Sequence, residues 1–194
     1  MNTAEPIREQ QDLERFKDYY LNEKPNPRNY TLLCMGLNTA LRISDILQLQ
    51  WQDVYDFEHN KFRFHIQLLE QKTGKCSRIY LNQNAIEALC FYKSQLQKQG
   101  AILPERYLFE GDKNIPISRV QAWRIIKRAA EACGLQGVIS PHSLRKTFGY
   151  QAWQQGIPPV MLMEIYNHSS FTITKRYLGI QQDDRDEVFR NVCI

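Results

Sequence analysis

Apolar residues recur at helical spacing along most of this chain, and the pattern predicts a mainly α-helical fold. The polar start leads into a helix with Leu13, Phe16 and Tyr20 on one side, which the stretch 22–27 ends. Further helices are predicted over residues 29–37, 43–49, 82–99, 119–133, 140–156, 158–166, 172–178 and 183–194.

Three short segments have the β-branched and aromatic composition of strands. They cover residues 54–57, 62–69 and 78–81. The last two flank the sequence QKTGK at residues 71–75, whose glycine is typical of a hairpin tip. The predicted fold class is therefore α+β, mainly α with a small antiparallel β component.

The helix at residues 119–133 has two different sides. Its apolar residues predict a core-facing side made of Val120, Trp123, Ile126 and Ala130. Its other side is basic and carries Arg119, Arg124, Lys127 and Arg128. Such a run is usually a solvated face, although it also suits contact with a phosphate backbone.

The sequence SPHSLRKTFGYQAWQQG at residues 140–156 carries an H-x-x-R motif in the first turn of its predicted helix. Ser140 is the expected N-cap and Pro141 the first helical residue. His142 and Arg145 are three positions apart, so both leave the same face, close to the positive end of the helix dipole. This arrangement suits an anion, although the short motif alone fits an ordinary capped helix equally well.

Arg42 directly precedes the predicted helix 43–49. The helix dipole is positive there, which disfavours a cation. An arginine in this position indicates a nearby anion, which is either Asp45 or a ligand.

Composition and charge narrow the functional classes. The 194 residues are 43% hydrophobic, enough for one packed domain, and no apolar run is long enough to span a bilayer. Five scattered cysteines without C-x-x-C spacing predict neither a zinc site nor a disulfide framework, and a cytoplasmic location is expected. Residues 1–180 carry 23 basic and 17 acidic side chains, which favours a polyanionic partner.

Six residues in a fixed order carry a resemblance to one family. They are Arg42 in ALRISDIL, Lys72 in QKTGK, His142 and Arg145 in PHSLRKTF, His168 in NHSS and Tyr177 in TITKRYLGI. This order resembles the catalytic domain of the tyrosine recombinases, the phage integrase family, over roughly residues 8–180. The resemblance implies the family's mainly helical fold with a three-stranded antiparallel sheet.

The resemblance also implies a chemistry that these residue types can perform. Tyr177 would be the nucleophile that forms a 3′-phosphotyrosine with DNA, and Tyr166 is a rival that breaks the family's order. Arg42 and Arg145 would bind the non-bridging oxygens of the scissile phosphate. His168 would donate a further hydrogen bond to the same phosphate, and His142 would assist proton transfer from Tyr177. Lys72, or its rival Lys75, would be the general acid. Asp45 would hold the active-site arginines in place. No metal or cofactor is implied.

Double-stranded DNA is the expected partner. The side chains expected to contact it are Lys75, Arg119, Arg124, Lys127, Arg128 and Lys146. The family further implies a homotetramer on paired DNA sites, an accessory DNA-bending protein as a possible partner, and a nucleoid-associated location. The target sequence, and the choice between integration, excision and inversion, are not encoded in recognisable motifs.

Two departures from the family pattern stand out. Asn167 replaces the usual glycine before His168, and we expect the turn to survive because asparagine tolerates the left-handed conformation. The N-terminal core-binding domain is missing, which indicates a natural short member with a catalytic domain at residues 1–180. The tail at residues 181–194 carries Val188, Phe189 and Val192, and it either docks on a neighbouring protomer or folds back on its own domain.

Two other functions compete with recombination. A type IB topoisomerase-like enzyme would share the arginines, lysine and tyrosine, but it usually carries lysine where His142 stands. A non-catalytic DNA-binding regulator would have lost a catalytic residue, and none of the six is lost here.

Overall fold

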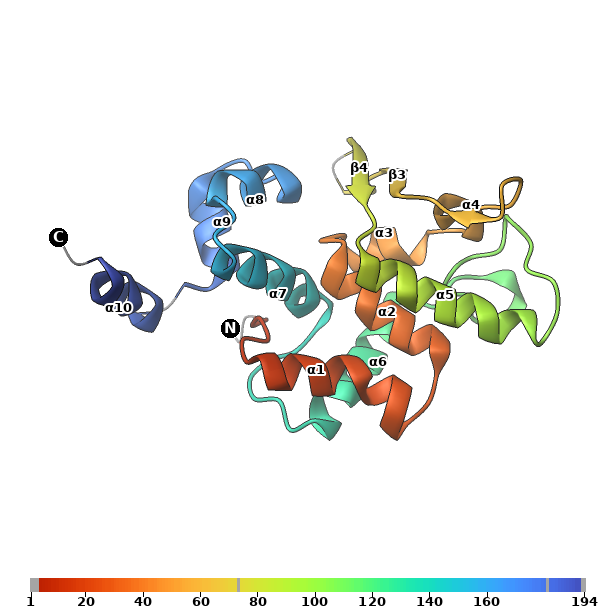
Figure 1. Ribbon diagram of the computed structural model, residues 1–194, viewed down its shortest axis with the longest axis horizontal. Helices are drawn as coiled ribbons and strands as arrows, with labels where there is room; N and C mark the ends of the chain where they lie inside the picture. The colour runs from red at the N-terminus through yellow and green to blue at the C-terminus, as the bar shows by residue number, and fades with distance from the viewer. Residues whose placement is uncertain (1–3, 73, 181, 193–194) are drawn as a thin grey trace.

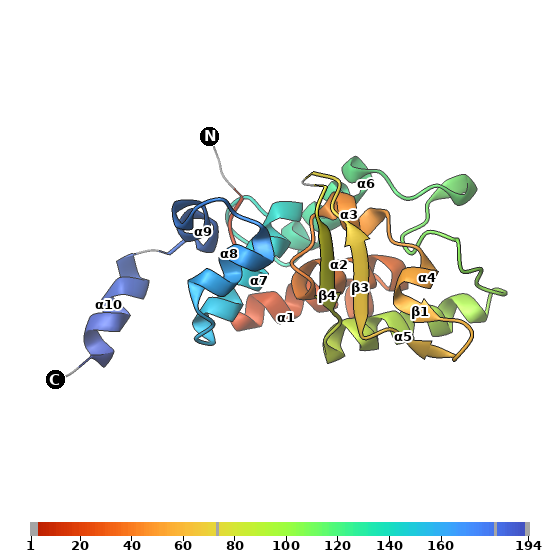
Figure 2. The ribbon, with the colours of Figure 1, turned by 90° about the horizontal axis from the view of Figure 1, so that it is seen from above.

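The computed structural model describes residues 4–72, 74–180 and 182–192, which form a mainly helical fold with two small hairpins at its edge (Figures 1 and 2). The helices are α1 (Gln10–Asp18), a π-helical turn (Tyr19–Glu23), α2 (Pro27–Asn38), α3 (Ile43–Leu47), α4 (Trp51–Val54), α5 (Gln83–Gln97), a 3₁₀ turn (Asp112–Asn114), α6 (Arg119–Ala132), α7 (Pro141–Gln154), α8 (Pro159–Tyr166), α9 (Phe171–Leu178) and α10 (Gln182–Asn191). The strands are β1 (Tyr55–Asp56), β2 (Lys61–Phe62), β3 (His65–Leu69) and β4 (Cys76–Tyr80). The predicted α+β class is confirmed.

Helix α2 is the central element, and α1, α5 and α7 pack around it (Figure 1). The side chain of Asn26 accepts a hydrogen bond from the Asn29 amide, and Pro27 occupies the first turn. Every residue from 31 to 37 is buried. Gly36 allows α7 to approach closely, because a Cβ atom there would lie 2.5 Å from Cδ1 of Leu144.

Three apolar clusters divide the core. The first packs α2, α3, α4, β3 and α5 around the buried Trp51. The second joins α1, α2, α6 and α7 around Phe16. The third is small and joins α7, α8 and α9 through Leu162, Tyr166 and Leu178, so it supports the C-terminal end of the fold.

The β structure differs from a single three-stranded sheet. Among the described residues, β1 pairs with β2 and β3 pairs with β4, giving two separate antiparallel pairs. The predicted strand 62–69 is interrupted after Phe62, and its two parts have different partners. The Arg63 amide still donates to the Val54 carbonyl, whereas the carbonyl of the exposed Phe64 accepts a hydrogen bond from the Leu81 amide, beside the second pair.

Most helix boundaries match the sequence-based expectation within two residues, and Asn82 and Ser118 accept the expected capping hydrogen bonds. The predicted core side of α6 is partly wrong. Val120 and Trp123 are 56% and 41% exposed. The buried side instead contains Ile126 and Ala130 together with two small residues, Ala122 and Ala129, which let the helix pack closely.

Helix α10 projects from the rest of the fold in both views (Figures 1 and 2). Its first turn is attached through Asp184, which contacts Arg8 at 3.7 Å and accepts from Gln154 at 3.5 Å. The end of the predicted tail helix, residues 193–194, lies outside the described residues. Within the described ranges, no helix has both the length and the apolar character needed to cross a bilayer.

Candidate active site

Arg42 occupies the N-cap position of α3 and is bound by a carboxylate. Its Nη1 donates to Oε2 of Glu70, a buried residue that directly follows β3. Glu70 therefore supplies an anion beside this arginine, a partner that the sequence pattern did not predict. Asp45 contacts the residue that follows Glu70, since its Oδ1 accepts from the backbone amide of Gln71 at 3.1 Å.

Arg145 in the first turn of α7 is only 4% exposed. Its Nη1 donates to the carbonyl of Ala40, and its Nη2 donates to the carbonyl of Tyr166 at 3.1 Å. A guanidinium group has five N–H donors, so these two contacts fix its plane and leave other donors for a ligand.

Tyr166, the last residue of α8, packs against Arg145 and holds it in place. The Arg145 guanidinium lies 4.7 Å from the centre of the Tyr166 ring, and the Tyr166 hydroxyl donates to the Arg145 carbonyl at 2.8 Å. Gly149 makes room for this ring, because a Cβ atom there would lie 2.3 Å from the hydroxyl oxygen. Burial raises the pKa of Tyr166, which keeps its hydroxyl protonated.

The turn after α8 places His168. Asn167 has φ 54° and ψ 42°, so the expected left-handed turn forms with asparagine in place of glycine. His168 Nδ1 lies 3.0 Å from the Thr174 hydroxyl, and its ring packs 5.0 Å from that of Tyr177. Burial, with a smaller contribution from Arg145 and Arg42, lowers the pKa of His168.

Tyr177 points its hydroxyl toward the first turn of α7. The hydroxyl oxygen lies 3.5 Å from Nδ1 of His142, and the ring packs 5.0 Å from that of Tyr166. Burial raises the pKa of Tyr177, and the cations Arg145 and Arg42 partly offset this effect. Deprotonation therefore needs a nearby base.

His142 is suited to be that base. Partial burial lowers its pKa below the usual value, and the cations Arg145, Lys146, Lys72 and Arg42 lower it further. The imidazole is consequently neutral at neutral pH, so one ring nitrogen can accept a proton.

One cavity joins the cationic side chains. It has a volume of about 360 Å³, and Arg42, Lys72, His142 and Arg145 line it together with Arg119. Lys75 is not among its lining residues, which favours Lys72 over its rival. Tyr177 lies beside this cavity through its contact with His142, and the His168 ring packs against that of Tyr177. A cavity with this lining suits a small anion such as a phosphate group.

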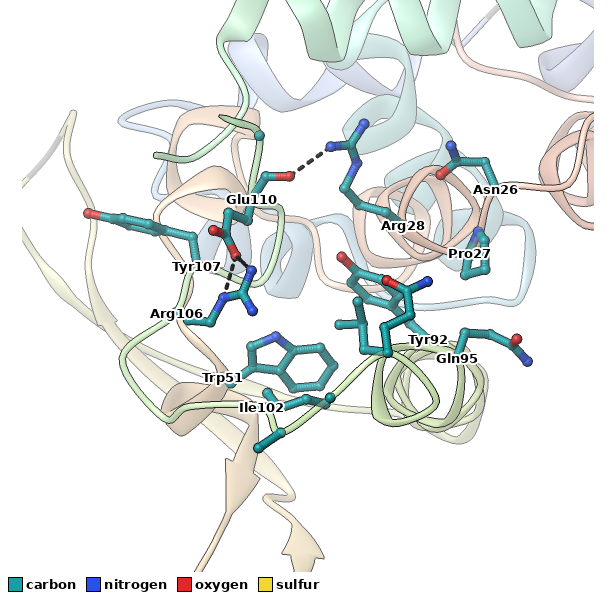
Figure 3. A pocket seen from close by; sticks show the side chains of 15 residues that line it. Asn26, Pro27, Arg28, Trp51, Tyr92, Gln95, Ile102, Arg106, Tyr107 and Glu110 are labelled. Carbon is teal, nitrogen blue, oxygen red and sulfur yellow. Dashed lines mark hydrogen bonds and ion pairs between the residues drawn. The ribbon is translucent and has the colours of Figure 1, made fainter. Parts of the chain in front are cut away.

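A second cavity of about 490 Å³ lies elsewhere, between α2, α5 and the loop at residues 100–111 (Figure 3). Its charged groups are engaged with each other. Arg106 donates to the Glu110 carboxylate at 2.6 Å, and Arg28 donates to the Glu110 carbonyl at 2.7 Å. None of the predicted site residues lines it, so it is separate from the candidate site. Among the described residues, no group of three His, Cys, Asp or Glu side chains is placed to bind a metal.

Comparison with known proteins identifies the family. The profile of the phage integrase family matches residues 8–183, nearly the whole chain. The chain belongs to the phage integrase family. The probable integrase/recombinase YoeC of Bacillus subtilis is 40% identical over 184 residues, which cover 94% of this chain and 93% of that protein. The tyrosine recombinase XerD of Corynebacterium glutamicum is 37% identical over 166 residues, covering 84% of this chain and 52% of XerD.

Solved structures show the same fold. The crystal structure of XerA recombinase superimposes with a TM-score of 0.77 at 18% identity, covering 99% of this chain and 68% of that one. XerH site-specific recombinase, bound to palindromic difH substrate, also gives 0.77 and covers 98% of this chain and 53% of that one. This phage integrase family member thus corresponds to part of each of those longer proteins.

The predicted DNA-contacting residues of this integrase family member lie in different surroundings. Arg119 lines the cavity, and the other α6 cations are exposed, with Lys127 paired to Glu131 at 3.4 Å. Lys146 is turned inward, because its ammonium donates to the Ala4 carbonyl at 2.8 Å and lies 5.5 Å from the centre of the Tyr177 ring.

Sequence reasoning missed Glu70 and assigned Tyr166 only as a rival nucleophile. The available signal for Glu70 was its position, an acidic residue between an apolar strand and the hairpin tip. This signal is weak, because any polar residue, such as lysine or serine, suits an exposed position there. For Tyr166 the signal was Gly149 within a helix, since an interior glycine often marks a close approach.

Proposed function

We propose that the chain is a DNA strand transferase of the site-specific recombinase type, acting through a 3′-phosphotyrosine at Tyr177. The observation that carries this proposal is the Tyr177 hydroxyl facing His142 beside the cavity lined by Arg42, Arg145 and Lys72. A single scissile phosphate in this cavity would meet all of these groups.

Each group then has a defined task. The Tyr177 oxygen attacks phosphorus, a new phosphorus–oxygen bond forms, and the bond to the DNA 5′-oxygen breaks. The tyrosine proton passes to His142, and Lys72 gives a proton to the departing 5′-oxygen. Arg42, Arg145 and His168 stabilise the charge on the non-bridging oxygens. Attack by a 5′-hydroxyl of another strand reverses the steps and completes strand transfer.

The domain, the DNA partner, the oligomeric state and the location of the protein are proposed on the same basis and from its family. Residues 1–180 form the catalytic domain, double-stranded DNA is its partner, and a homotetramer on paired sites carries out the exchange, in some cases with a DNA-bending protein. The exposed cations of α6 and the cavity's Arg119 are suited to contact the DNA backbone next to the scissile phosphate. Its place of action is the cytoplasm, at the nucleoid.

A covalent-trapping experiment tests the proposal. The chain is incubated with a library of random-sequence duplexes, each nicked so that the short downstream fragment with the freed 5′-hydroxyl diffuses away after cleavage, and adducts are isolated in denaturant. Enrichment of particular sequences, with nucleotides attached to the Tyr177 peptide, is the expected result. Binding of DNA without any adduct would instead support a non-catalytic DNA-binding regulator. Relaxation of a supercoiled plasmid without strand exchange would support a topoisomerase.

The tail is proposed to dock on a neighbouring protomer. Val188 and Phe189 on α10, and Val192 directly after it, are 56%, 80% and 60% exposed, so the tail keeps these apolar side chains away from its own domain. Truncation after Ile180 should reduce the association of protomers on DNA, as measured by analytical ultracentrifugation. Full-length Phe189→Asp, which changes only the stripe, should show the same reduction, and unchanged association in both would refute docking.

A further inference from the structure

Glu70 connects three parts of the site. The side chain is 4% exposed, and one oxygen, Oε2, accepts from Nη1 of Arg42. The other oxygen, Oε1, accepts from the Ser77 hydroxyl at 2.6 Å and from Nδ2 of Asn167 at 2.8 Å. A single buried carboxylate thus contacts the start of α3, strand β4 and the turn after α8.

The contact with Asn167 explains why this position carries asparagine. A glycine would adopt φ 54° at least as readily, but it has no side-chain donor. Asparagine supplies both the left-handed conformation and an amide directed at Glu70. The next residue in the chain is His168, whose backbone amide bonds the Met163 carbonyl at 3.0 Å. The Glu70–Asn167 hydrogen bond therefore fixes the turn from which the His168 side chain extends.

Glu70 also lies two residues before Lys72, and its backbone closes the hairpin. The Glu70 amide donates to the Lys75 carbonyl at 2.9 Å, and the Gly74 amide donates to the Glu70 carbonyl at 2.8 Å. Side-chain and backbone contacts of one residue thus reach Arg42, the turn of His168 and the hairpin of Lys72. A charged group that is almost fully buried is stable only where its partners are held in fixed positions.

We propose that Glu70 is a positioning residue, which, with Asn167 as its partner, sets the relative places of Arg42, His168 and the lysine hairpin. The proposal rests on the proposed strand-transfer function, since it gives these three groups a common phosphate. Glu70 itself does not touch the DNA. Disturbing it should slow the chemical step and leave DNA affinity nearly unchanged.

The Asn167→Asp variant gives the sharpest test. Aspartate has the same shape and also tolerates the left-handed conformation, but it places a second carboxylate 2.8 Å from Glu70 in a buried site. Two carboxylates this close cannot both ionise without a large cost. We expect single-turnover cleavage to fall about tenfold or more at pH 8 and to recover as the pH falls and one carboxylate takes up a proton.

Two further variants separate positioning from folding. Glu70→Gln alone keeps the shape, and rotation of the Asn167 amide restores a hydrogen bond, so cleavage should stay within about fivefold of wild type. In the double variant Glu70→Gln/Asn167→Asp, the amide nitrogen introduced at position 70 donates to the carboxylate introduced at position 167. The amide oxygen at position 70 accepts from Arg42. Cleavage by the double variant should return to the level of Glu70→Gln and lose the pH dependence of Asn167→Asp.

The measurements are single-turnover cleavage of a trapped site between pH 6 and 8, DNA affinity in a Tyr177→Phe background, and thermal melts of each variant. An Asn167→Asp variant that cleaves like wild type across this range, a double variant that does not recover, or a loss confined to affinity would each overturn the positioning role. A wild-type chain that forms no adduct at all would overturn the proposed function instead.

Discussion

Tyr177→Phe should abolish covalent attachment to DNA while the chain remains folded. The phenyl ring keeps the packing against Tyr166 and His168, both at 5.0 Å between ring centres. The lost hydroxyl has a long contact, 3.5 Å to Nδ1 of His142, so the free energy of unfolding should fall by no more than about 1 kcal/mol. The nucleophile has no replacement, and removing one typically costs a factor on the order of 10⁴ or more in rate.

Tyr166→Phe is the matched control. It also removes a tyrosine hydroxyl, from the ring that packs against Tyr177, but this hydroxyl donates to the Arg145 carbonyl rather than contacting His142. Adduct formation should therefore persist in Tyr166→Phe at a reduced rate, with a modest loss of stability. Adducts formed by Tyr177→Phe, together with none from Tyr166→Phe, would identify Tyr166 as the nucleophile. The measurement is denaturing electrophoresis of trapped DNA complexes.

The sequence allowed prediction of what depends on local pattern. Helix spans follow from apolar spacing and capping residues, and Asn82 and Ser118 cap their helices as expected. The H-x-x-R motif could be assigned because three-residue spacing on a helix places two side chains on one face. Asn167 was correctly expected to keep the turn, since its left-handed conformation is a local property.

Properties that depend on distant partners could not be predicted. Asp45 is three positions from Arg42 and was one of the two expected anions, the other being a ligand, yet the carboxylate that binds Arg42 is 28 positions away. Alternation could not show that the strand after Phe62 would bend and change partners. On α6 the buried side is marked by alanines, which carry a weak hydrophobic signal, so Trp123 was wrongly assigned to the core.

Arg145→Lys should lose both activity and stability. Arg145 is 4% exposed, and its fork bonds two carbonyls, those of Ala40 and Tyr166. A lysine amine is a single point donor on a flexible stem, so it cannot bond both carbonyls and also bind two phosphate oxygens. Losing such a donor from the transition state should slow cleavage by about 10²–10³. A buried carbonyl left without a partner should cost about 1–3 kcal/mol of unfolding free energy.

Arg119→Lys is the same substitution at the same cavity, but its side chain is exposed and lies at the start of α6. It should change unfolding free energy by less than about 0.5 kcal/mol, as exposed substitutions usually do. Cleavage should fall only modestly, through weaker DNA binding. Single-turnover cleavage and urea unfolding of the two variants compare buried and exposed arginine directly. Because Arg145 is locked in place by the protein's own carbonyls, a similar result for both variants would show that this preorganised geometry does not contribute to catalysis.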